Sequence, residues 1–372
     1  MDANFSWIER LPELLRWGSG NEDLLRAICT SHIRWTYQNL ADWCHFGDPS
    51  LYNDILALPR HCQQRLVLAP RLSYILSFLL RSRRSGTEEL ETLRDFVSIE
   101  HEIAGGSFYR KGRERWSALG DYYAPPGEAV NLCAPHDWSE GSSYLARKLG
   151  HIVLDTCSPI WNLPNLHSHR AIIPQDAAEM PCVESKLKDA LTYIAAVNPN
   201  TFALVGASLQ SIIPVKLPER PRFRAGCSWT PVIGAMSLTN AQSEYWSTPR
   251  FVDNIVHESI HSLIYKIELS TSLYTSSEAS WQVNAISPWS GRKLQLHSFV
   301  HACFVWYGLW QFWRQATAQN FVESDEFLNE ARSGFLTGPL FEGENAGTQA
   351  HVHPSVLSAM EKVTSDVCST AS

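Results

Sequence analysis

Two histidines four positions apart, with a glutamate beside the first, are the residues of this sequence most clearly arranged for chemistry. They are His257, Glu258 and His261, in the stretch FVDNIVHESIHSLIYKIEL. On a helix, residues four apart share one face, so both imidazoles can bind one metal ion. Apolar neighbours surround the pair, and burying unpaired imidazoles is costly, which favours a metal site over an ordinary polar stripe.

A mononuclear site of this kind needs a third protein ligand. The sequence offers Glu268, Glu278, His297, His301, His351 and His353. Glu278 lies near the spacing of glutamate-type zinc peptidases, whereas Glu268, two helical turns beyond His261, is expected to be too far away. We favour His301, because its surroundings are the most apolar and its helix should cross the core. His297 is then expected to be a pocket residue beside the ligand.

The elements that must position these residues are expected to be mainly helical. Residues 1 to about 120 carry apolar residues every three or four positions, and 186–197 form an amphipathic pattern. The segments 201–217 and 225–240 have β-branched runs broken by glycine and proline, which predicts strands. A long apolar helix is expected over 293–316.

These patterns predict an α+β protein that is largely helical. We expect a helical N-terminal region at residues 1–150. Residues 151–372 are expected to form a zincin-like metal-binding catalytic region, in which a small sheet accompanies the helix of the H-E-x-x-H motif.

Composition restricts the class of protein. The chain has 372 residues, 44% of them hydrophobic, and a formal net charge of -7, which argues against a nucleic-acid-binding surface. It has no apolar run long enough to span a membrane and no signal-like N-terminus. The nine cysteines are scattered and form no C-x-x-C pair, which predicts reduced thiols. We therefore expect a cytoplasmic protein.

A second segment, SPWSGRKLQLHSFVHACFVWYGL, makes the sequence more specific. Together with the H-E-x-x-H motif it resembles the HExxH-motif proteins encoded in clusters for ribosomally synthesised and modified peptides (RiPPs). The resemblance covers about residues 200–315 and rests on His257, Glu258, His261, Ser287, Pro288, Trp289, Arg292 and His301. Two departures from the usual family pattern are Gly291-Arg292 in place of Asp-Pro-Arg, and Ala302 in place of a glycine.

The resemblance implies an Fe(II)- and 2-oxoglutarate-dependent oxygenase that hydroxylates a β-carbon of a residue in a peptide, with or without a leader segment. The ligands would be His257, His261 and His301, which leave coordination positions open as in other iron oxygenases. Arg292 would bind the distal carboxylate of 2-oxoglutarate through its bidentate fork. Trp289 would line the cofactor pocket with His297.

Other assignments of these residues stay open. Arg250 and Lys293 are alternative partners for the carboxylate, and Trp281 is an alternative pocket wall. The alternative function is a zinc peptidase, in which Glu258 is the general base that activates metal-bound water. A third reading is a closed structural metal site with His297 as a fourth ligand.

Overall fold

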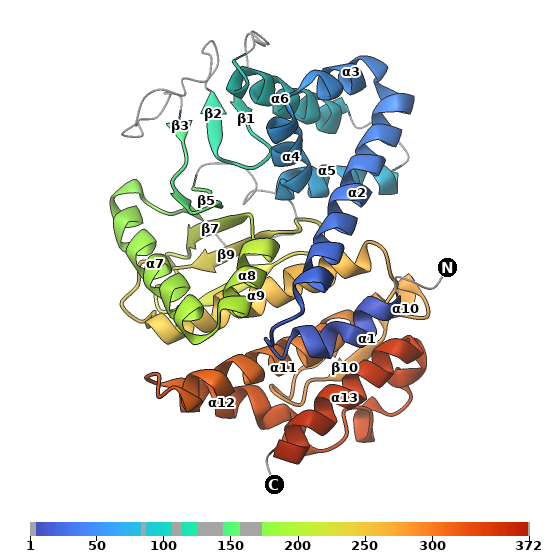
Figure 1. Ribbon diagram of the computed structural model, residues 1–372, viewed down its shortest axis with the longest axis vertical. Coiled ribbons are helices and arrows are strands. Elements are labelled where there is room, and N and C mark those ends of the chain that lie inside the picture. The colour runs from blue at the N-terminus through green and yellow to red at the C-terminus, as the bar shows by residue number, and fades with distance from the viewer. Residues whose placement is uncertain (1–4, 83–86, 106–113, 125–143, 157–172, 371–372) are drawn as a thin grey trace. The chain divides into compact units, whose positions relative to one another are not determined.

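The computed structural model describes residues 5–82, 87–105, 114–124, 144–156 and 173–370 (Figure 1). The protein is mostly helical, at 64%, with a small mixed sheet, which confirms the predicted α+β composition. The chain divides into two compact units, which are described separately below. Unit 1 comprises residues 1–32, 189–208 and 247–372, and unit 2 comprises 33–188 and 209–246.

Unit 1 is a set of helices with one hairpin. Its helices are α1 (Phe5–Leu14), the start of α2 (Glu22–Gly47), the end of α7 (Met180–Val197), α8 (Pro199–Ser208), α9 (Thr248–Glu268), α10 (Ser277–Gln282), α11 (Leu296–Ala318), α12 (Ser324–Ser333) and α13 (Pro354–Thr370). The hairpin pairs β10 (Asn284–Ile286) with β11 (Lys293–Gln295), and short 3-10 turns cover Gly334–Thr337, Gly343–Asn345 and Thr348–His351.

Helices α9 and α11 form the centre of unit 1. Both are buried on nearly every face, as expected of helices that other elements surround. The start of α9 is set by Ser247, whose side chain accepts a hydrogen bond from the Arg250 backbone N–H at 3.4 Å, and by Pro249 in the first turn. This helix contains the whole H-E-x-x-H motif.

A glycine sets how closely α9 and α11 approach. A Cβ atom added to Gly308 of α11 would lie 2.6 Å from Cδ1 of Ile260 in α9, and 3.3 Å from side-chain atoms of Leu15 and Trp17. The Trp17 indole also donates a hydrogen bond to the Gly308 carbonyl at 2.9 Å. Glycine therefore stays in this helix interior, despite its poor helix propensity, because the neighbouring side chains occupy the space of a methyl group.

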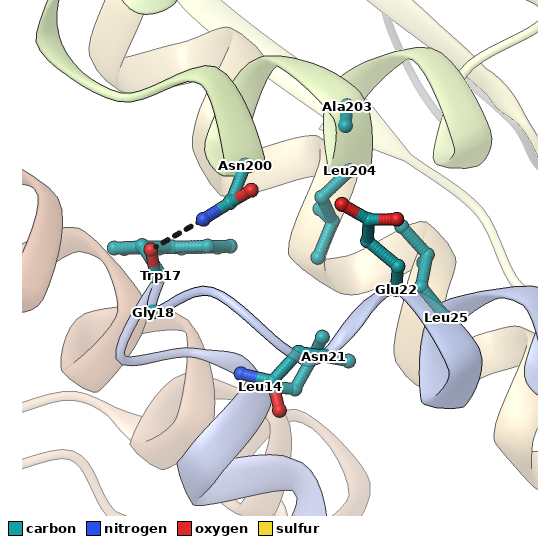
Figure 2. A pocket seen from close by; sticks show the side chains of 9 residues that line it. All are labelled: Leu14, Trp17, Gly18, Asn21, Glu22, Leu25, Asn200, Ala203 and Leu204. Atoms are coloured by element: carbon teal, nitrogen blue, oxygen red, sulfur yellow. Dashed lines mark hydrogen bonds between the residues drawn. The ribbon is translucent and has the colours of Figure 1, made fainter.

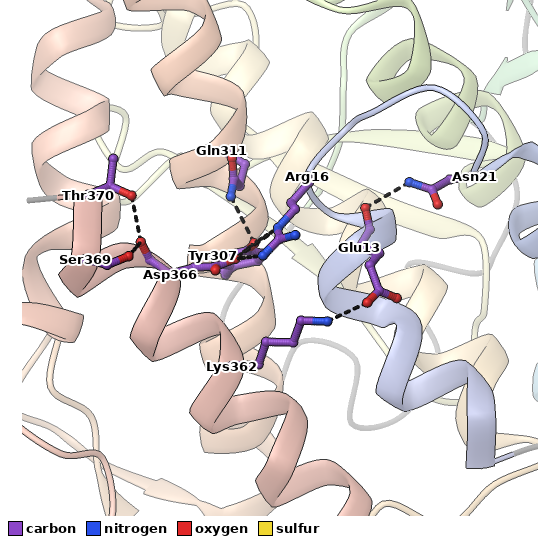
Figure 3. Close-up of polar contacts among 9 residues, drawn as sticks. All are labelled: Glu13, Arg16, Asn21, Tyr307, Gln311, Lys362, Asp366, Ser369 and Thr370. Carbon is purple, nitrogen blue, oxygen red and sulfur yellow. Dashed lines mark hydrogen bonds and ion pairs between the residues drawn. The ribbon is translucent and has the colours of Figure 1, made fainter.

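Polar contacts join α1 and the turn that follows it to α11 and α13 (Figure 3). Arg16 Nε donates to the Tyr307 hydroxyl at 3.1 Å and to Asp366 at 3.0 Å, while Tyr307 donates to Asp366 at 2.6 Å. Lys362 of α13 pairs with Glu13 of α1 at 2.5 Å. The first helix of the chain is thus held against the last, far away in sequence.

Unit 2 contains the remaining helices and the two larger sheets. Its helices are the rest of α2, α3 (Pro49–Ala57), α4 (Arg60–Leu68), α5 (Pro70–Ser82), α6 (Thr87–Ile103) and the start of α7, with the 3-10 turn Ala177–Glu179. A three-stranded antiparallel sheet joins β1 (Arg115–Trp116), β2 (Tyr122–Ala124) and β3 (Tyr144–Leu145).

The second sheet of unit 2 is mixed. Its order is β4-β5-β7-β9-β8, with β6 also paired to β7, and the β5–β7 and β7–β9 pairs are parallel. The bounds are β4 (Lys148–Leu149), β5 (Ile152–Leu154), β6 (Ile173–Pro174), β7 (Ser211–Lys216), β8 (Ala225–Ser228) and β9 (Ala235–Thr239). Every residue of β9 is buried, as parallel pairing with two covered faces requires.

A buried ion cluster stabilises unit 2. Arg65 of α4 contacts Glu100 at 2.9 Å and Asp121 at 2.8 Å, and Lys148 contacts Asp121 at 2.7 Å. Both carboxylate side chains are fully buried. Burial raises the pKa of Glu100, whereas for Asp121 the hydrogen bonds from Arg65 outweigh burial and lower the pKa.

The predicted elements are confirmed where the apolar period was long. The helix expected over 186–197 is the end of α7. The one expected over 293–316 is α11, except that its first three residues form strand β11. The strand expected over 201–217 is wrong in its first half, which belongs to α8. The Asn198 side chain accepts hydrogen bonds from the Asn200 and Thr201 backbone N–H groups, and this cap with Pro199 starts a helix.

Two further expectations concern the whole chain. The zincin-like core, which would combine the mixed sheet with the helix of the H-E-x-x-H motif, stays a prediction. In the ranges that the structure describes, no helix has both the length and the apolar character needed to cross a bilayer.

Candidate metal centre

Four histidines lie in a row where α9 packs against α11. Successive ring centroids are 5.0 Å apart from His257 to His261, 5.3 Å from His261 to His301, and 4.3 Å from His301 to His297. The contact between the helices is direct, since the Nδ1 atoms of His261 and His301 are 3.1 Å apart. Residues four apart on each helix therefore become one continuous line of imidazoles.

A carboxylate completes the row at the His297 end. The Oε2 atom of Glu268 lies 3.2 Å from Nε2 of His297 and 3.3 Å from Nε2 of His301. Within the described part of the chain, Glu268, His297 and His301 are the one group of three potential ligands whose atoms all lie within 4.8 Å of one another. This buried Glu/His/His cluster could hold a metal ion.

The spacing and chemistry of the cluster fit a metal ion. Two ligands each about 2.1 Å from an ion, at a right angle, lie about 3 Å apart, and the contacts of Glu268 have this length. The Nε2 atom of His301 is buried and close to the carboxylate, yet it lacks hydrogen-bond geometry. Two imidazoles with one carboxylate are a donor set of non-haem iron centres, with zinc also possible for imidazole ligands.

The electrostatics favour neutral imidazoles beside an ionised carboxylate. Burial lowers the pKa of His257 to about 4 and lowers the pKa values of His261 and His301 as well. For Glu268, burial raises the pKa, but the electrostatic interaction with His301 and the hydrogen bonds with His297 and His301 outweigh it and lower the pKa to about 2.

The position of Glu268 in its helix also points to a cation. It is the last residue of α9, where the helix dipole places partial negative charge and disfavours another anion. A metal ion at this end would offset both charges.

Aromatic residues cover the His297 end of the row. The Trp281 indole stacks on the His297 ring with centroids 4.5 Å apart, although 45% of this tryptophan is exposed. The Tyr274 hydroxyl donates to the His297 carbonyl at 3.4 Å, and the Tyr265 ring lies 5.0 Å from that of His301. The cluster is therefore buried but lies directly beneath an exposed indole.

The structure brings together some of the predicted site residues and adds one that sequence reasoning set aside. His301 belongs to the cluster, and so does His297, which was expected to be only a pocket residue. Glu268 was expected to be too far from His261 to share its ion. It joins the site through α11 instead, because α11 runs back along α9 and places His297 beside the end of that helix.

The remaining residues of the motif lie at the other end of the row. His257 and His261 are half-buried, and the His257 ring meets Trp306 edge-on at 5.9 Å. Glu258 is 5% exposed. Metal binding by His257, His261 and His301 stays a prediction, as does a catalytic role for Glu258.

Residues proposed for the cofactor pocket fall in or near the β10–β11 hairpin. Arg292 is exposed in its turn and makes no ion pair with any described residue, while the next residue, Lys293, is also exposed. Trp289 packs instead: its indole donates to the Ala331 carbonyl at 3.0 Å and stacks on Trp306 at 5.9 Å.

The alternative candidates are engaged elsewhere. Arg250 lies over the Phe327 ring at 4.4 Å and faces Glu326 and Glu330 of α12. Glu278 is exposed and accepts a hydrogen bond from Gln282 at 2.8 Å. Neither belongs to the metal-ligand cluster.

A small pocket lies elsewhere in unit 1 (Figure 2). The turn between α1 and α2 and one face of α8 form its walls, and the Asn200 side chain donates to the Trp17 carbonyl at 3.0 Å. Its lining is mostly apolar and includes none of the histidines of the row. This pocket is therefore separate from the histidine row.

No protein-family model matches this chain, and no curated protein matches it.

Proposed function

We propose that this chain is an Fe(II)- and 2-oxoglutarate-dependent oxygenase that hydroxylates a β-carbon of a residue in a peptide. The observation that carries the proposal is the convergence of Glu268, His297 and His301, because two histidines and a carboxylate are the donor set of non-haem iron oxygenases. The sequence resemblance to RiPP-associated HExxH proteins supports the choice of 2-oxoglutarate and of a peptide, but it implies His257, His261 and His301 as ligands, and the proposal replaces that set with this cluster.

In this proposal the three ligands hold the ion from the protein side and leave other positions open to small molecules. Bound ferrous iron with 2-oxoglutarate and dioxygen supplies the oxidising chemistry for hydroxylating an unactivated carbon. The protein contributes orientation, since the His297 ring is held between Trp281 and His301. Burial of the ligands excludes water from the site.

Arg292 is the proposed partner of the distal carboxylate of 2-oxoglutarate. Its guanidinium has no described anionic partner, and its hairpin leads through β11 directly into α11, where His297 is the second residue. Removing this group should weaken 2-oxoglutarate binding by about tenfold to a hundredfold, as loss of a hydrogen bond to a charged group does. Lys293→Ala tests the adjacent exposed cation, which is the alternative partner, and it should leave 2-oxoglutarate binding unchanged if Arg292 is the partner.

The peptide is proposed to approach past Trp281. A half-exposed indole over a buried ligand offers a flat apolar surface for a substrate side chain. Trp281→Ala should therefore raise KM for the peptide more than it lowers kcat.

The second candidate is a zinc peptidase, favoured by the H-E-x-x-H motif on a regular helix. His257 and His261 would be its ligands, and Glu258 the general base. It predicts that Glu258→Gln abolishes peptide cleavage in zinc-loaded protein while Glu268 is dispensable for metal binding.

One experiment separates the two candidates. The protein is loaded anaerobically with Fe(II), titrated with 2-oxoglutarate and followed by metal-to-ligand charge-transfer absorption. Peptides are then incubated with the loaded protein, 2-oxoglutarate and dioxygen. Their masses are measured by mass spectrometry. A charge-transfer band that is lost in Glu268→Ala, with a gain of one oxygen in the peptide, supports the oxygenase. Cleavage in zinc without 2-oxoglutarate or oxygen, and no band, would establish the peptidase.

A further inference from the structure

Three exposed arginines lie in the loop that joins β7 to β8 in unit 2. They are Arg220, Arg222 and Arg224, in the stretch PERPRFRAG. None of them forms an ion pair with a described residue, although acidic residues outnumber basic ones in the chain by 38 to 31. The acids nearest to them in sequence or through Tyr245, which are Glu219 and Glu244, are not their partners either. The loop at residues 217–224, here called the arginine loop, therefore presents three guanidinium groups without a described counter-ion.

Aromatic rings hold these guanidinium groups in place. The guanidinium carbon atoms of Arg222 and Arg224 lie 5.4 and 6.0 Å from the centre of the Tyr245 ring. That of Arg220 lies 5.0 Å from the centre of the Phe223 ring. Arg224 also donates a hydrogen bond to the Tyr245 carbonyl. Stacking restricts the motion of each side chain and leaves N–H groups at the edge of the guanidinium plane for an anion.

The backbone of the arginine loop is held as well. The side-chain amide of Asn240 donates to the carbonyls of Arg220 at 3.0 Å and Phe223 at 2.8 Å. Its oxygen accepts a hydrogen bond from the Leu217 backbone N–H at 2.8 Å. The Phe223 N–H also donates to the Arg220 carbonyl at 2.9 Å. Because the loop is ordered in advance, the arginines lose less conformational freedom when they bind a partner.

We propose that the arginine loop binds an acidic segment of a peptide. Each guanidinium can donate two parallel N–H bonds to one carboxylate, so three of them match a short run of acidic side chains. A nucleic acid fits less well, because it requires an extended basic surface, and this chain has a formal net charge of -7. The Tyr245 ring, 41% exposed, adds apolar surface for the peptide. The inference rests on the proposed function for the peptide as partner and adds the charge of the segment that is bound.

Fluorescence anisotropy with labelled model peptides tests the inference. The metal-free protein is titrated into fluorescein-labelled hexaglutamate, with labelled hexaglutamine as the uncharged probe. We expect binding of hexaglutamate alone, with an affinity that falls as salt rises, because exposed charges are screened. Arg220→Gln and Arg222→Gln should each weaken binding about twofold to fivefold. The triple variant that also carries Arg224→Gln should lose about tenfold or more.

A second triple variant controls for the change in net charge. It carries Arg34→Gln, Arg60→Gln and Arg314→Gln, which replace exposed arginines outside the loop that have no ion pair with a described residue. Both triple variants have the same net charge, so only the loop variant should lose affinity for hexaglutamate. Equal losses in the two variants, or no binding of hexaglutamate by wild type, would overturn the inference.

Two further arms keep the test independent of loop folding and of the probe. The Arg220→Gln/Arg222→Gln double variant leaves the hydrogen bond of Arg224 in place, so its loss of affinity reports charge alone. Tyr245→Phe should bind as wild type does, and Tyr245→Ala about twofold to fivefold more weakly, because only the first keeps the ring. An oligothymidylate of equal charge that binds more tightly than hexaglutamate would overturn the choice of a peptide.

Failure of this inference and failure of the proposed function give different results. Binding of hexaglutamate is measured without metal or 2-oxoglutarate, whereas the charge-transfer band is measured without peptide. A band without hexaglutamate binding would overturn the inference and leave the oxygenase standing. Binding that depends on the arginine loop, without a band, would support the inference in a protein of another function.

Discussion

At the scale of single residues, the site depends on a carboxylate that is unfavourably placed without a cation. Glu268 ends α9, faces two imidazoles and is ionised at neutral pH, because its pKa is lowered to about 2. Two neutral imidazoles would stabilise the charge of this carboxylate less than a divalent ion would. The identity of this one side chain therefore decides between an iron-type donor set and an all-histidine set.

We predict that Glu268→Gln lowers Co(II) affinity at the cluster with His297 and His301 by at least about a hundredfold. Mutation of partners outside the ligand shell already costs about 10–100-fold, and loss of a ligand charge should cost more. Calorimetric titration measures the dissociation constants. Glu278→Gln is the control and should bind as wild type does. Equal affinities in the two variants would remove Glu268 from the site.

Asp253 is a second residue whose environment shifts its pKa, and this shift affects how stability depends on pH. It lies in α9, and its Oδ1 accepts a hydrogen bond from the Trp313 indole at 2.9 Å. Burial raises its pKa to about 7, against the opposing influence of Trp313 and Arg250. The folded protein therefore binds this proton more tightly than the unfolded chain does.

This shift sets the sign of a pH dependence. Between about pH 4 and pH 7 the folded state holds more protons than the unfolded state, so the contribution of Asp253 to stability falls as pH rises and is constant above. Relative to Asp253→Asn, wild type should lose about 2–3 kcal/mol between pH 5 and pH 8. Urea unfolding of both proteins at the two pH values measures this, and parallel pH profiles would contradict it.

At the scale of elements, the alignment of α9 with α11 is what places the imidazoles in a row. Gly308 lies on α11 two turns beyond His301, and Ile260 adjoins His261 on α9. Their close approach therefore acts on the same helix pair as the His261–His301 contact. A packing change where the two helices cross should therefore shift the positions of the metal ligands.

We predict that Gly308→Ala destabilises the protein by up to about 2 kcal/mol. Overpacking a core costs about 1–3 kcal/mol, and the gain in helix propensity returns up to about 1 kcal/mol. Ile260→Val removes Cδ1, the atom nearest the new methyl group, so the double variant should recover part of the loss. Urea unfolding of the four proteins measures the coupling, and strictly additive effects would show that the two residues do not meet.

At the scale of the whole molecule, two compact units are stabilised in different ways. Unit 2 contains the buried cluster of Arg65, Glu100 and Asp121, while unit 1 contains the histidine row. In each unit charged or polar groups are buried, but only in unit 1 does a metal ion fit as their partner among the described residues. Substitutions in the ion cluster of unit 2 should therefore lower the stability of the metal-free protein. Substitutions in the histidine row should instead remove the stabilisation that a metal ion gives.

We predict that Arg65→Met costs about 3–5 kcal/mol of stability, because it leaves buried carboxylates without their main partner. Arg26→Met is the control, since Arg26 and Asp23 form an exposed pair that should contribute less than about 1 kcal/mol. Calorimetry on the metal-free proteins compares them. Similar losses in both would show that the burial of the cluster has no energetic consequence.

We also predict that a metal ion stabilises the folded protein through unit 1. At a free Co(II) concentration about 100 times the dissociation constant, the gain is about 2.7 kcal/mol. The resulting rise in Tm should disappear in Glu268→Ala and persist in Arg65→Met. A rise that survives in Glu268→Ala would place the stabilising ion elsewhere.

Local sequence patterns predicted much of the helical structure and part of the site. The apolar period identified α7 and α11, and the spacing of His257 and His261 placed both on one face of a helix, because these relations depend on residues a few positions apart. The pattern failed where local capping competed with β propensity, as Asn198 and Pro199 turned the segment after them into α8.

By itself, then, the sequence determined the helices α9 and α11 and the four-residue spacing of the histidines within each of them. Only the tertiary structure decided that Glu268 joins His297 and His301, and that His301 meets His261. Along α9 alone, Glu268 is roughly 10 Å from His261, too far to share an ion. The packing of α11 back along α9 supplies imidazoles beside both residues, and contacts between distant segments depend on side-chain fit across the core rather than on any local period.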